Sequence, residues 1–350
     1  MARFDRCGEI IPNAVSEPGP PGRVNAQQSV PSRTKWIDIA RGLGIILVVW
    51  GHVIRANIDL GSNPLMMEED RWLYSFHMPL FFVLAGLFLW PNIEKGRIRF
   101  LRNRWLAIIW PYILWSLILG IVEIAATRYV NSPMNVVDLL RIPFAPIEQF
   151  WFLYALLICQ LVCVMAFPSI WRLWLLSAAG IILLFTIGGD WIGIRAMAYL
   201  PFVAVGVTAA HSFDALSRSS KLARFGVSAS GWALLAIVLV FVPSPASSLP
   251  FKIIAGLGGS VGCIGIATLL SRWKNPLADA LSLLGQASLV IYILHTLFSA
   301  GARIALKLVG VPASDPMNVG LSFFAGLFIP WGCHFFLKDR RLAQTLGFGA

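Results

Sequence analysis

Charged residues are scarce in this chain of 350 residues. Lys, Arg, Asp and Glu together make up 13% of the chain, whereas soluble globular domains carry about 25%. Hydrophobic residues make up 57%. This composition excludes an ordinary soluble protein and indicates a membrane protein.

Cysteine is also scarce, and its placement excludes a disulfide framework. Cys7 lies in a polar segment, and the other four of the five cysteines lie inside apolar runs. Cys159 and Cys163 are four residues apart, which puts two thiols on one helical face. No His or carboxylate lies nearby to complete a metal site, so we expect these thiols to pack in the core and expect no metal cofactor.

The first 35 residues lack the apolar segment that a secretory signal requires. They are rich in Pro, Ser, Gly and Arg, as in "SEPGPPGRVNAQQSVPSR", and cannot bury enough apolar surface to fold alone. We therefore predict a disordered cytoplasmic tail over residues 1–35, a membrane-embedded domain over 36–340, and a short cytoplasmic tail over 341–350.

Long apolar runs fill most of the remaining chain. A helix needs about 20 apolar residues to cross a bilayer, and runs of suitable length recur ten times. The expected spans are 37–55, 73–91, 105–127, 150–167, 170–188, 196–211, 228–243, 252–270, 282–301 and 318–337. The sequence therefore predicts an all-α, polytopic bundle of about ten transmembrane helices.

The net charge of +11 is explained by topology. Of the 28 Lys and Arg residues, 19 fall in segments on one side of the ten expected spans and eight on the other. Because cytoplasmic segments carry the excess of Lys and Arg, both termini are predicted to be cytoplasmic. We therefore expect the lipid bilayer, and not nucleic acid, as the partner that this charge reflects.

The first span carries two ionisable residues that lipid disfavours. Arg41 and His52 are separated by ten residues, so their side chains lie nearly on one helical face at depths about 16 Å apart. The arginine would lie near the cytoplasmic side and the histidine near the outer side. An alternative role for Arg41 is an ion pair with Asp38, three residues earlier.

Other polar residues fall at the depth of His52 under the same topology. His77 lies in the second span, Glu123 near the end of the third, Glu148 before the fourth and His295 in the ninth. Histidine is the side chain best suited to move a proton near neutral pH. The carboxylates have an alternative role as ordinary interfacial residues at helix ends.

A basic segment follows the second span and contains Arg99, Arg102 and Arg104. Arginine binds phosphate through a planar fork of donors, so these three residues are candidates for phosphate binding. The alternative is that they serve only topology, because cytoplasmic loops are basic whatever the function.

Five segments in order along the chain carry a resemblance to a known family. They are the Arg41 and His52 pair, "SFHMPLFFVLAG", "RNRWLAIIWPY", "FWFLYALL" and "IYILH". Over about residues 35–340 the chain resembles the integral membrane acyltransferase 3 family, and within it the fucose 4-O-acetylase-like and nodulation-factor O-acetyltransferase-like members. Unlike some members, it shows no C-terminal esterase-like domain.

The resemblance implies an O-acyltransferase of the bacterial inner membrane. The donor would be cytoplasmic acyl-CoA as co-substrate, most simply acetyl-CoA, with succinyl or longer groups left open. The acceptor would be a sugar hydroxyl in a glycolipid, surface polysaccharide or related glycoconjugate. Arg41 and His52 match the family's defining pair, His77 its "FHMPLFF" segment, and Arg102 and Arg104 its basic segment.

The residues and the resemblance together predict a mechanism. CoA phosphates would bind the cytoplasmic arginines, His52 would act as general base on the acceptor hydroxyl, and Arg41 would stabilise CoA or developing negative charge. Alternatively His52 or His77 would carry the acyl group briefly. Glu123 is the candidate to orient an imidazole.

A transporter or flippase of a lipid-linked sugar is the competing function, since it would also place polar groups inside a bundle. The chain shows no repeat symmetry of the kind that many transporters have. In the eighth span, Gly258 and Gly262 are four residues apart, a spacing that lets helices approach closely within or between chains. The oligomeric state is left open.

Overall fold

The structure is a computed structural model that describes residues 32–57, 64–128, 134–188, 191–242, 248–338 and 340–348. Of the predicted disordered tail, residues 1–31 lie outside this part, and with them Cys7. Residues 32–35 belong to the first helix. The description below concerns the unit that begins at Ser32.

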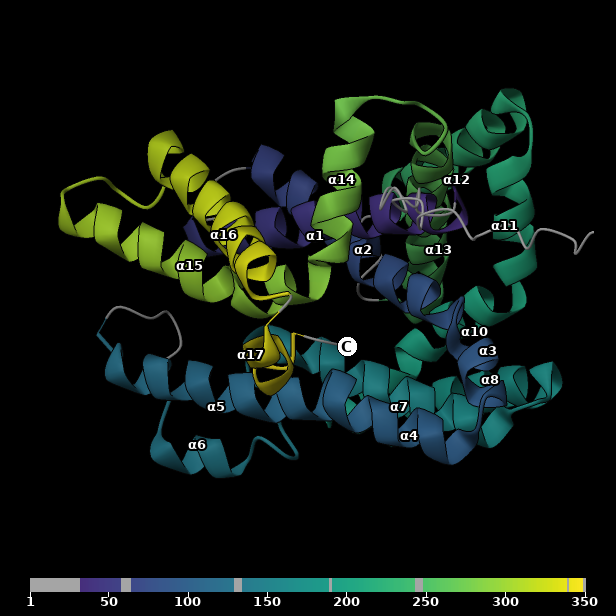
Figure 1. Ribbon diagram of the computed structural model, residues 1–350, viewed down its shortest axis with the longest axis horizontal. Coiled ribbons are helices and arrows are strands. Elements are labelled where there is room, and N and C mark those ends of the chain that lie inside the picture. Colours follow the sequence, from purple (N-terminus) through teal and green to yellow (C-terminus); the bar gives the residue numbers. More distant parts are fainter. Residues whose placement is uncertain are drawn as a thin grey trace, which may run out of the picture. The chain divides into compact units, whose positions relative to one another are not determined.

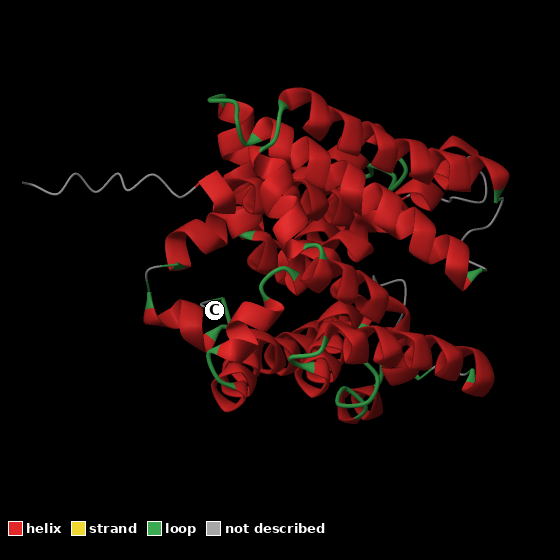
Figure 2. Cartoon of the chain, turned by 90° about the vertical axis from the view of Figure 1, so that its right-hand side faces the viewer, coloured by secondary structure: helices red, strands yellow, loops and turns green. Residues whose placement is uncertain are grey.

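The described residues form helices and turns without a strand (Figure 2), which confirms the predicted all-α fold. The long helices are α1 (Ser32–Asn57), α2 (Pro64–Gly86), α5 (Trp110–Ala125), α7 (Trp151–Ala166), α8 (Ile170–Ile187), α12 (Lys221–Phe241), α13 (Leu249–Leu270), α15 (Ser288–Leu308) and α16 (Pro316–Leu337). Shorter helices are α3 (Leu89–Glu94), α4 (Arg97–Arg104), α6 (Val136–Leu140), α9 (Ile192–Arg195), α10 (Leu200–Thr208), α11 (Ala210–Arg218), α14 (Pro276–Gln286) and α17 (Arg341–Thr345), with a π turn η2 (Trp105–Ile109) and 3-10 turns η3 (Glu148–Phe150) and η4 (Ala196–Tyr199).

Nine helical segments of the described ranges are long and apolar enough to cross a membrane. A tenth is obtained if Ile192–Thr208 and Ala210–Arg218, which are bent by 54° relative to each other, count as one span. The chain is therefore a multi-pass membrane protein, with nine or ten candidate spans among the described residues where the apolar runs predict about ten.

The prediction for the ninth span is wrong at its start. Residues 282–286 belong to the separate helix α14, and the span itself begins at Ser288. Local chemistry explains the separate helix, because Pro276 fits the first helical turn and the Asn275 side chain caps it by accepting from the Ala278 N–H at 2.9 Å.

Helix α1 packs mainly against α2, α13, α14, α15 and α16 (Figure 1). Its crossing with α14 is especially close. A Cβ on Gly42 would lie 2.0 Å from the Leu281 carbonyl oxygen, and one on Gly285 would lie 1.8 Å from the Asp38 carbonyl oxygen. Only glycine permits this approach, which brings the end of α14 beside Arg41.

The predicted glycine face of the eighth span packs within the chain. A Cβ on Gly231 of α12 would lie 2.7 Å from the Gly258 carbonyl oxygen and 2.5 Å from the Gly262 amide nitrogen of α13. Backbone therefore meets backbone at this crossing, as small residues allow in lipid.

A second group of helices contains α4, α5, α7 and α8, which lie together in Figure 1. Helix α10 connects the groups by packing on both α2 and α8. The C-terminal segment folds back onto α5, where Trp110 Nε1 donates to the Thr345 carbonyl at 2.7 Å and Trp115 stacks on Phe348. Two cavities lie between the α1, α2, α15 side and the α4, α5, α7 side.

Candidate active site

The two cavities are placed at opposite ends of α1. We call them the arginine cavity, of about 460 Å³ and lined by Arg41 and Arg104, and the histidine cavity, of about 540 Å³ and lined by His52, His77 and Glu123. Because of their spacing along α1, Arg41 lines one cavity and His52 lines the adjoining one.

Arg41 lies partly exposed in the arginine cavity. Its guanidinium is 3.8 Å from the Asp38 carboxylate and 5.8 Å from the centre of the Phe88 ring. The ion pair considered for Arg41 and Asp38 is thus present, but it is long. Because Asp38 engages only part of the guanidinium, Arg41 can form this pair and also bind a ligand in the cavity.

The basic segment contributes one residue to the arginine cavity. Arg104 lines it, and its Nε is buried without a hydrogen-bond partner among the described residues. Arg99 and Arg102 are exposed and lie outside the lining. The π turn η2 follows Arg104 directly and also lines the cavity through Ala107 and Ile108. Such turns are frequent at functional sites.

The histidine cavity brings together residues that the sequence placed at one depth. His52 from α1, His77 from α2, Glu123 from α5 and Glu148 from η3 all line it. A Cβ on Gly51 would lie 2.6 Å from a Leu73 methyl group, so the glycine before His52 lets α2 approach α1 closely. This approach sets His52 and His77 beside the same space.

Two of the histidines have their tautomers fixed by backbone carbonyls. His77 Nδ1 lies 2.7 Å from the Leu73 carbonyl oxygen, and His295 Nδ1 lies 2.8 Å from that of Tyr292. A carbonyl oxygen only accepts, so each Nδ1 carries the proton and each neutral ring presents Nε2 as an acceptor.

His295 lies behind His52. It is fully buried, its Nε2 has no hydrogen-bond partner among the described residues, and its ring centre is 4.9 Å from that of His52. An unsatisfied buried acceptor next to an imidazole can accept one N–H of that imidazole and so orient its other nitrogen.

The carboxylates of the cavity differ in their surroundings. Glu123 is half-buried, and its Oε2 has no partner among the described residues. Glu148 is exposed and has a φ of 42°, a left-handed conformation that is uncommon for residues other than glycine. Strained residues of this kind cluster at functional sites. No contact joins Glu123 to a histidine, so its predicted orienting role stays a prediction.

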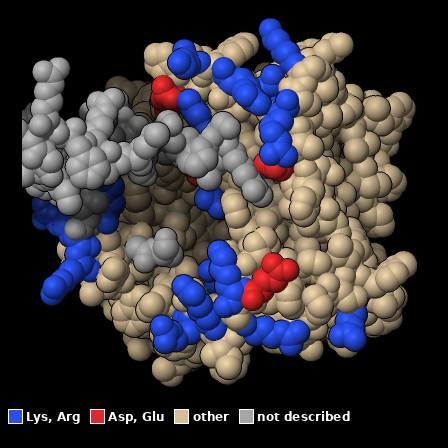
Figure 3. Space-filling model, turned by 45° about the vertical axis from the view of Figure 1, so that its right-hand side comes forward, with Lys and Arg blue, Asp and Glu red and all other residues tan. Residues whose placement is uncertain are grey.

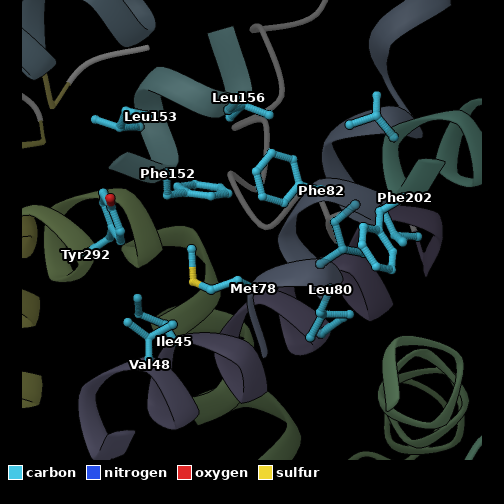
Figure 4. Close-up of a cluster of buried hydrophobic side chains, with 14 of the residues drawn as sticks. Ile45, Val48, Met78, Leu80, Phe82, Phe152, Leu153, Leu156, Phe202 and Tyr292 are labelled. Atoms are coloured by element: carbon cyan, nitrogen blue, oxygen red, sulfur yellow. The ribbon is translucent and has the colours of Figure 1, made fainter. Parts of the chain in front are cut away.

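The two cavities meet at Met78 and Tyr292, which line both. Both side chains are almost completely buried, at 8% and 6% exposure. Figure 4 shows them in one cluster with Phe152 of α7, whose ring centre is 5.4 Å from that of Tyr292. The thin partition between the cavities is therefore built from α2, α7 and α15.

Gln149 ties α15 to the start of α7. The Tyr292 hydroxyl donates to the Gln149 carbonyl, and Gln149 Nε2 donates to the Thr296 hydroxyl at 2.7 Å. These contacts hold the partition in place.

The sequence reasoning did not assign roles to Tyr292 and Gln149, although a Tyr three residues before His295 in a span was a usable signal.

Arg303 is a second residue that the sequence reasoning missed as a site residue. It lines the histidine cavity on α15 together with Tyr292, Thr296 and Ser299. Spacings of four, three and four residues place these side chains on one face of a helix, and that pattern was the available signal.

One face of the molecule carries many cationic side chains (Figure 3). Figure 3 shows Lys and Arg side chains gathered around a hollow on one face. Among the residues that the structure describes, no group of three or more His, Cys, Asp or Glu side chains is arranged to hold a metal ion. Cys159 and Cys163 are buried in the helical core as free thiols.

The fold and the site define a multi-pass membrane protein with two adjoining cavities inside one helix bundle, each with a few polar groups in a largely apolar lining. Residues 34–335 match the acyltransferase domain of the acyltransferase 3 family. The chain belongs to this family, and the resemblance seen in its motifs is confirmed.

Curated relatives agree with this assignment. The chain is similar to nodulation protein NolL of Mesorhizobium japonicum, with 25% identity over 170 residues covering 48% of this chain and 45% of the relative. It is also similar to nodulation protein NolL of Sinorhizobium fredii, with 26% identity over 149 residues covering 42% and 40%. The chain thus spans less than half the length of these relatives. No solved structure matches it.

Proposed function

We propose that this protein is an O-acyltransferase of the bacterial inner membrane. It moves an acyl group, most simply acetyl, from cytoplasmic acyl-CoA to a hydroxyl of a sugar in a glycolipid, surface polysaccharide or related glycoconjugate. One observation carries the proposal: Arg41 and His52 lie on one helix and line two cavities that share Met78 and Tyr292.

The arginine cavity suits the donor. Arg41 and Arg104 supply guanidinium donors for the phosphates of CoA, which a planar fork binds well. The apolar side chains of the lining, among them Phe81, Leu84 and Phe152, suit the slender pantetheine arm. The partition at Met78 and Tyr292 is where the thioester would reach the histidine cavity.

The orientation of the bundle follows from the positive-inside rule, with the arginine cavity facing the cytoplasm. The distribution of basic residues between the expected spans supports it. In this orientation the donor enters from the cytoplasm and the acceptor occupies the histidine cavity.

His52 is the proposed general base. A sugar hydroxyl loses its proton to the His52 nitrogen that faces the cavity, and its oxygen bonds to the thioester carbonyl carbon. The carbon–sulfur bond then breaks, and the proton passes to the leaving CoA thiolate. A brief acyl-imidazole at His52 or His77 is the alternative route, in which the hydroxyl attacks that intermediate.

His295 is proposed as a positioning residue. Its Nε2 has no hydrogen-bond partner among the described residues and lies next to His52. In the reacting complex it would accept the N–H of His52 on the side away from the cavity, which leaves the other His52 nitrogen as the base. Arg41 acts on CoA and on the negative charge that develops during transfer.

Transfer of radiolabelled acetyl from acetyl-CoA tests the proposal. Purified protein in liposomes is supplied with glycolipids extracted from a strain that lacks it, and labelled glycolipid is separated by chromatography. Label in the glycolipid with wild type but not with His52→Ala is expected. Movement of glycolipid between leaflets without any labelling would establish a flippase in its place.

A further inference from the structure

Arg303 is a buried cation without a counter-charge among the residues that the structure describes. It is 5% exposed, and its Nε is buried with no hydrogen-bond partner among the described residues. Its guanidinium takes part in no ion pair with a carboxylate of that part of the chain. An arginine inside a membrane protein is costly unless a partner compensates it.

The second cation of the histidine cavity shows the contrast. Arg55 also lines this space, but it binds the Asp70 carboxylate with two hydrogen bonds of 2.5 and 2.8 Å. Its charge is therefore balanced within the protein. Arg303 has no such partner for its Nε among the described residues, and it lines a cavity large enough to admit a ligand.

The position of Arg303 separates it from the proposed reaction centre. Arg303 is eleven positions after Tyr292 on α15, about 16 Å along the helix axis, and His295 is about 12 Å away by the same measure. Arg303 thus lies near the end of the cavity that is remote from the partition. A substituent on the same sugar carbon as the acylated hydroxyl would be too far away to contact it.

The other polar residues of the lining suit a sugar. The carboxylates of Glu123 and Glu148 and the hydroxyl of Thr296 line the same space, and such oxygens accept hydrogen bonds from sugar hydroxyls. A neutral sugar satisfies these groups but leaves the guanidinium unpaired. An anionic oxygen pair satisfies the guanidinium, because the fork of donors matches phosphate and carboxylate geometry.

We propose that Arg303 binds an anionic group, phosphate or carboxylate, carried by the acceptor at a distance of more than one sugar ring from the hydroxyl that is acylated. The acceptor is then an acidic or phosphate-bearing glycan. This assignment of the substrate class rests on the proposed function, whereas the anion site itself does not require turnover.

Thermal unfolding of the purified full chain in neutral detergent tests the site with simple probes. Glucose 1-phosphate, glucuronic acid and glucose are titrated separately, and the unfolding midpoint is followed. The two anionic sugars are expected to raise the midpoint of wild type, with glucose giving a far smaller effect. Charged hydrogen bonds contribute about 1.5–3 kcal/mol, so Arg303→Gln is expected to weaken anion binding roughly 10- to 100-fold.

Matched variants keep the test decisive. Lys307→Gln removes an exposed cation one turn further along α15 and is expected to leave anion binding unchanged. Arg303→Lys keeps the charge without the planar fork and is expected to bind the anions with intermediate affinity, which covers the case in which Arg303→Gln fails to fold. Equal effects of glucose and glucose 1-phosphate on wild type, or unchanged binding in both Arg303 variants, would overturn the proposal.

Two further measurements are needed. One distinguishes an anion on the acceptor from a lipid headgroup, and the other distinguishes failure of the Arg303 site from failure of the proposed function. In phosphatidylcholine nanodiscs, added phosphatidylglycerol is expected to leave glucose 1-phosphate binding intact. If phosphatidylglycerol abolished the binding of glucose 1-phosphate, the site would belong to a lipid headgroup and the acceptor assignment would be overturned. Acetyl transfer is assayed in the same preparation. Anion binding without transfer contradicts the proposed function alone, and transfer without anion binding contradicts the Arg303 site alone.

Discussion

His295 lies edge-on to His52, with ring centres 4.9 Å apart and ring planes at 66°. Because backbone carbonyls hold the proton on His295 Nδ1, its Nε2 is an acceptor without a hydrogen-bond partner among the described residues. For the proposed base His52, this buried acceptor has the place of the group that orients a catalytic base.

Replacing His295 separates positioning from simple packing. His295→Leu is expected to lower kcat roughly 10- to 100-fold, the effect of losing a hydrogen bond of about 1–3 kcal/mol, with little change in the KM for acyl-CoA. His295→Gln can present an amide oxygen near the Nε2 position and is expected to restore much of kcat. Equal losses in both variants, or a loss confined to KM, would contradict the positioning role.

Replacing His52 removes the proposed base. His52→Ala is expected to lower acyl transfer by about 10²- to 10⁴-fold, the usual contribution of general base catalysis, while the protein stays inserted and abundant in the membrane. Initial rates with radiolabelled acetyl-CoA measure the change. His211→Ala is the matched control, since His211 is an exposed histidine of α11. Turnover of His52→Ala at the wild-type rate would refute the assignment.

The two arginines of the basic segment are expected to differ. Arg104 lines the arginine cavity, whereas Arg102 is exposed outside it. Arg104→Ala is therefore expected to raise the KM for acyl-CoA roughly 10-fold or more, since hydrogen bonds to charged groups contribute about 1.5–3 kcal/mol. Arg102→Ala is expected to change it little. An unchanged KM in Arg104→Ala would leave this segment with a topological role only.

The crossing of α1 and α14 predicts a stability effect. A Cβ on Gly42 would lie 2.0 Å from the Leu281 carbonyl oxygen, so Gly42→Ala must displace backbone and is expected to cost about 1–3 kcal/mol. Gly320→Ala is the control, because nothing lies within 4 Å of a Cβ at that helical position. Thermal unfolding in detergent is the measurement. A Gly42→Ala midpoint equal to that of Gly320→Ala would show that the crossing is looser than described.

Several features of the fold were predictable because they depend on local periodicity. Apolar runs mark the spans, since a bilayer requires about 20 apolar residues per helix. The Arg41 and His52 stripe follows from the helical repeat alone. The glycine spacing of α13 likewise predicted a close crossing, although the sequence left open whether it lies within or between chains.

Other features depended on helices that are distant in the sequence. The start of the ninth span was mispredicted because α14 and α15 read as one apolar run, and the cap at Asn275 together with the crossing at Gly285 separates α14 as a helix of its own. Arg99 and Arg102 could not be told from Arg104 by composition. Only packing decides which of the three faces the cavity.

The sequence by itself determined that this chain is a membrane protein, that it has about ten transmembrane helices, and that a cation and an imidazole lie on one face of the first transmembrane helix. Each of these depends on residues within a single helix. Tertiary structure decided that His295 lies behind His52, that Met78 and Tyr292 divide two cavities, and that Arg303 has no counter-charge within the described part of the chain. These relationships join helices from distant parts of the chain, and helical periodicity within one segment carries no information about which neighbour it will meet.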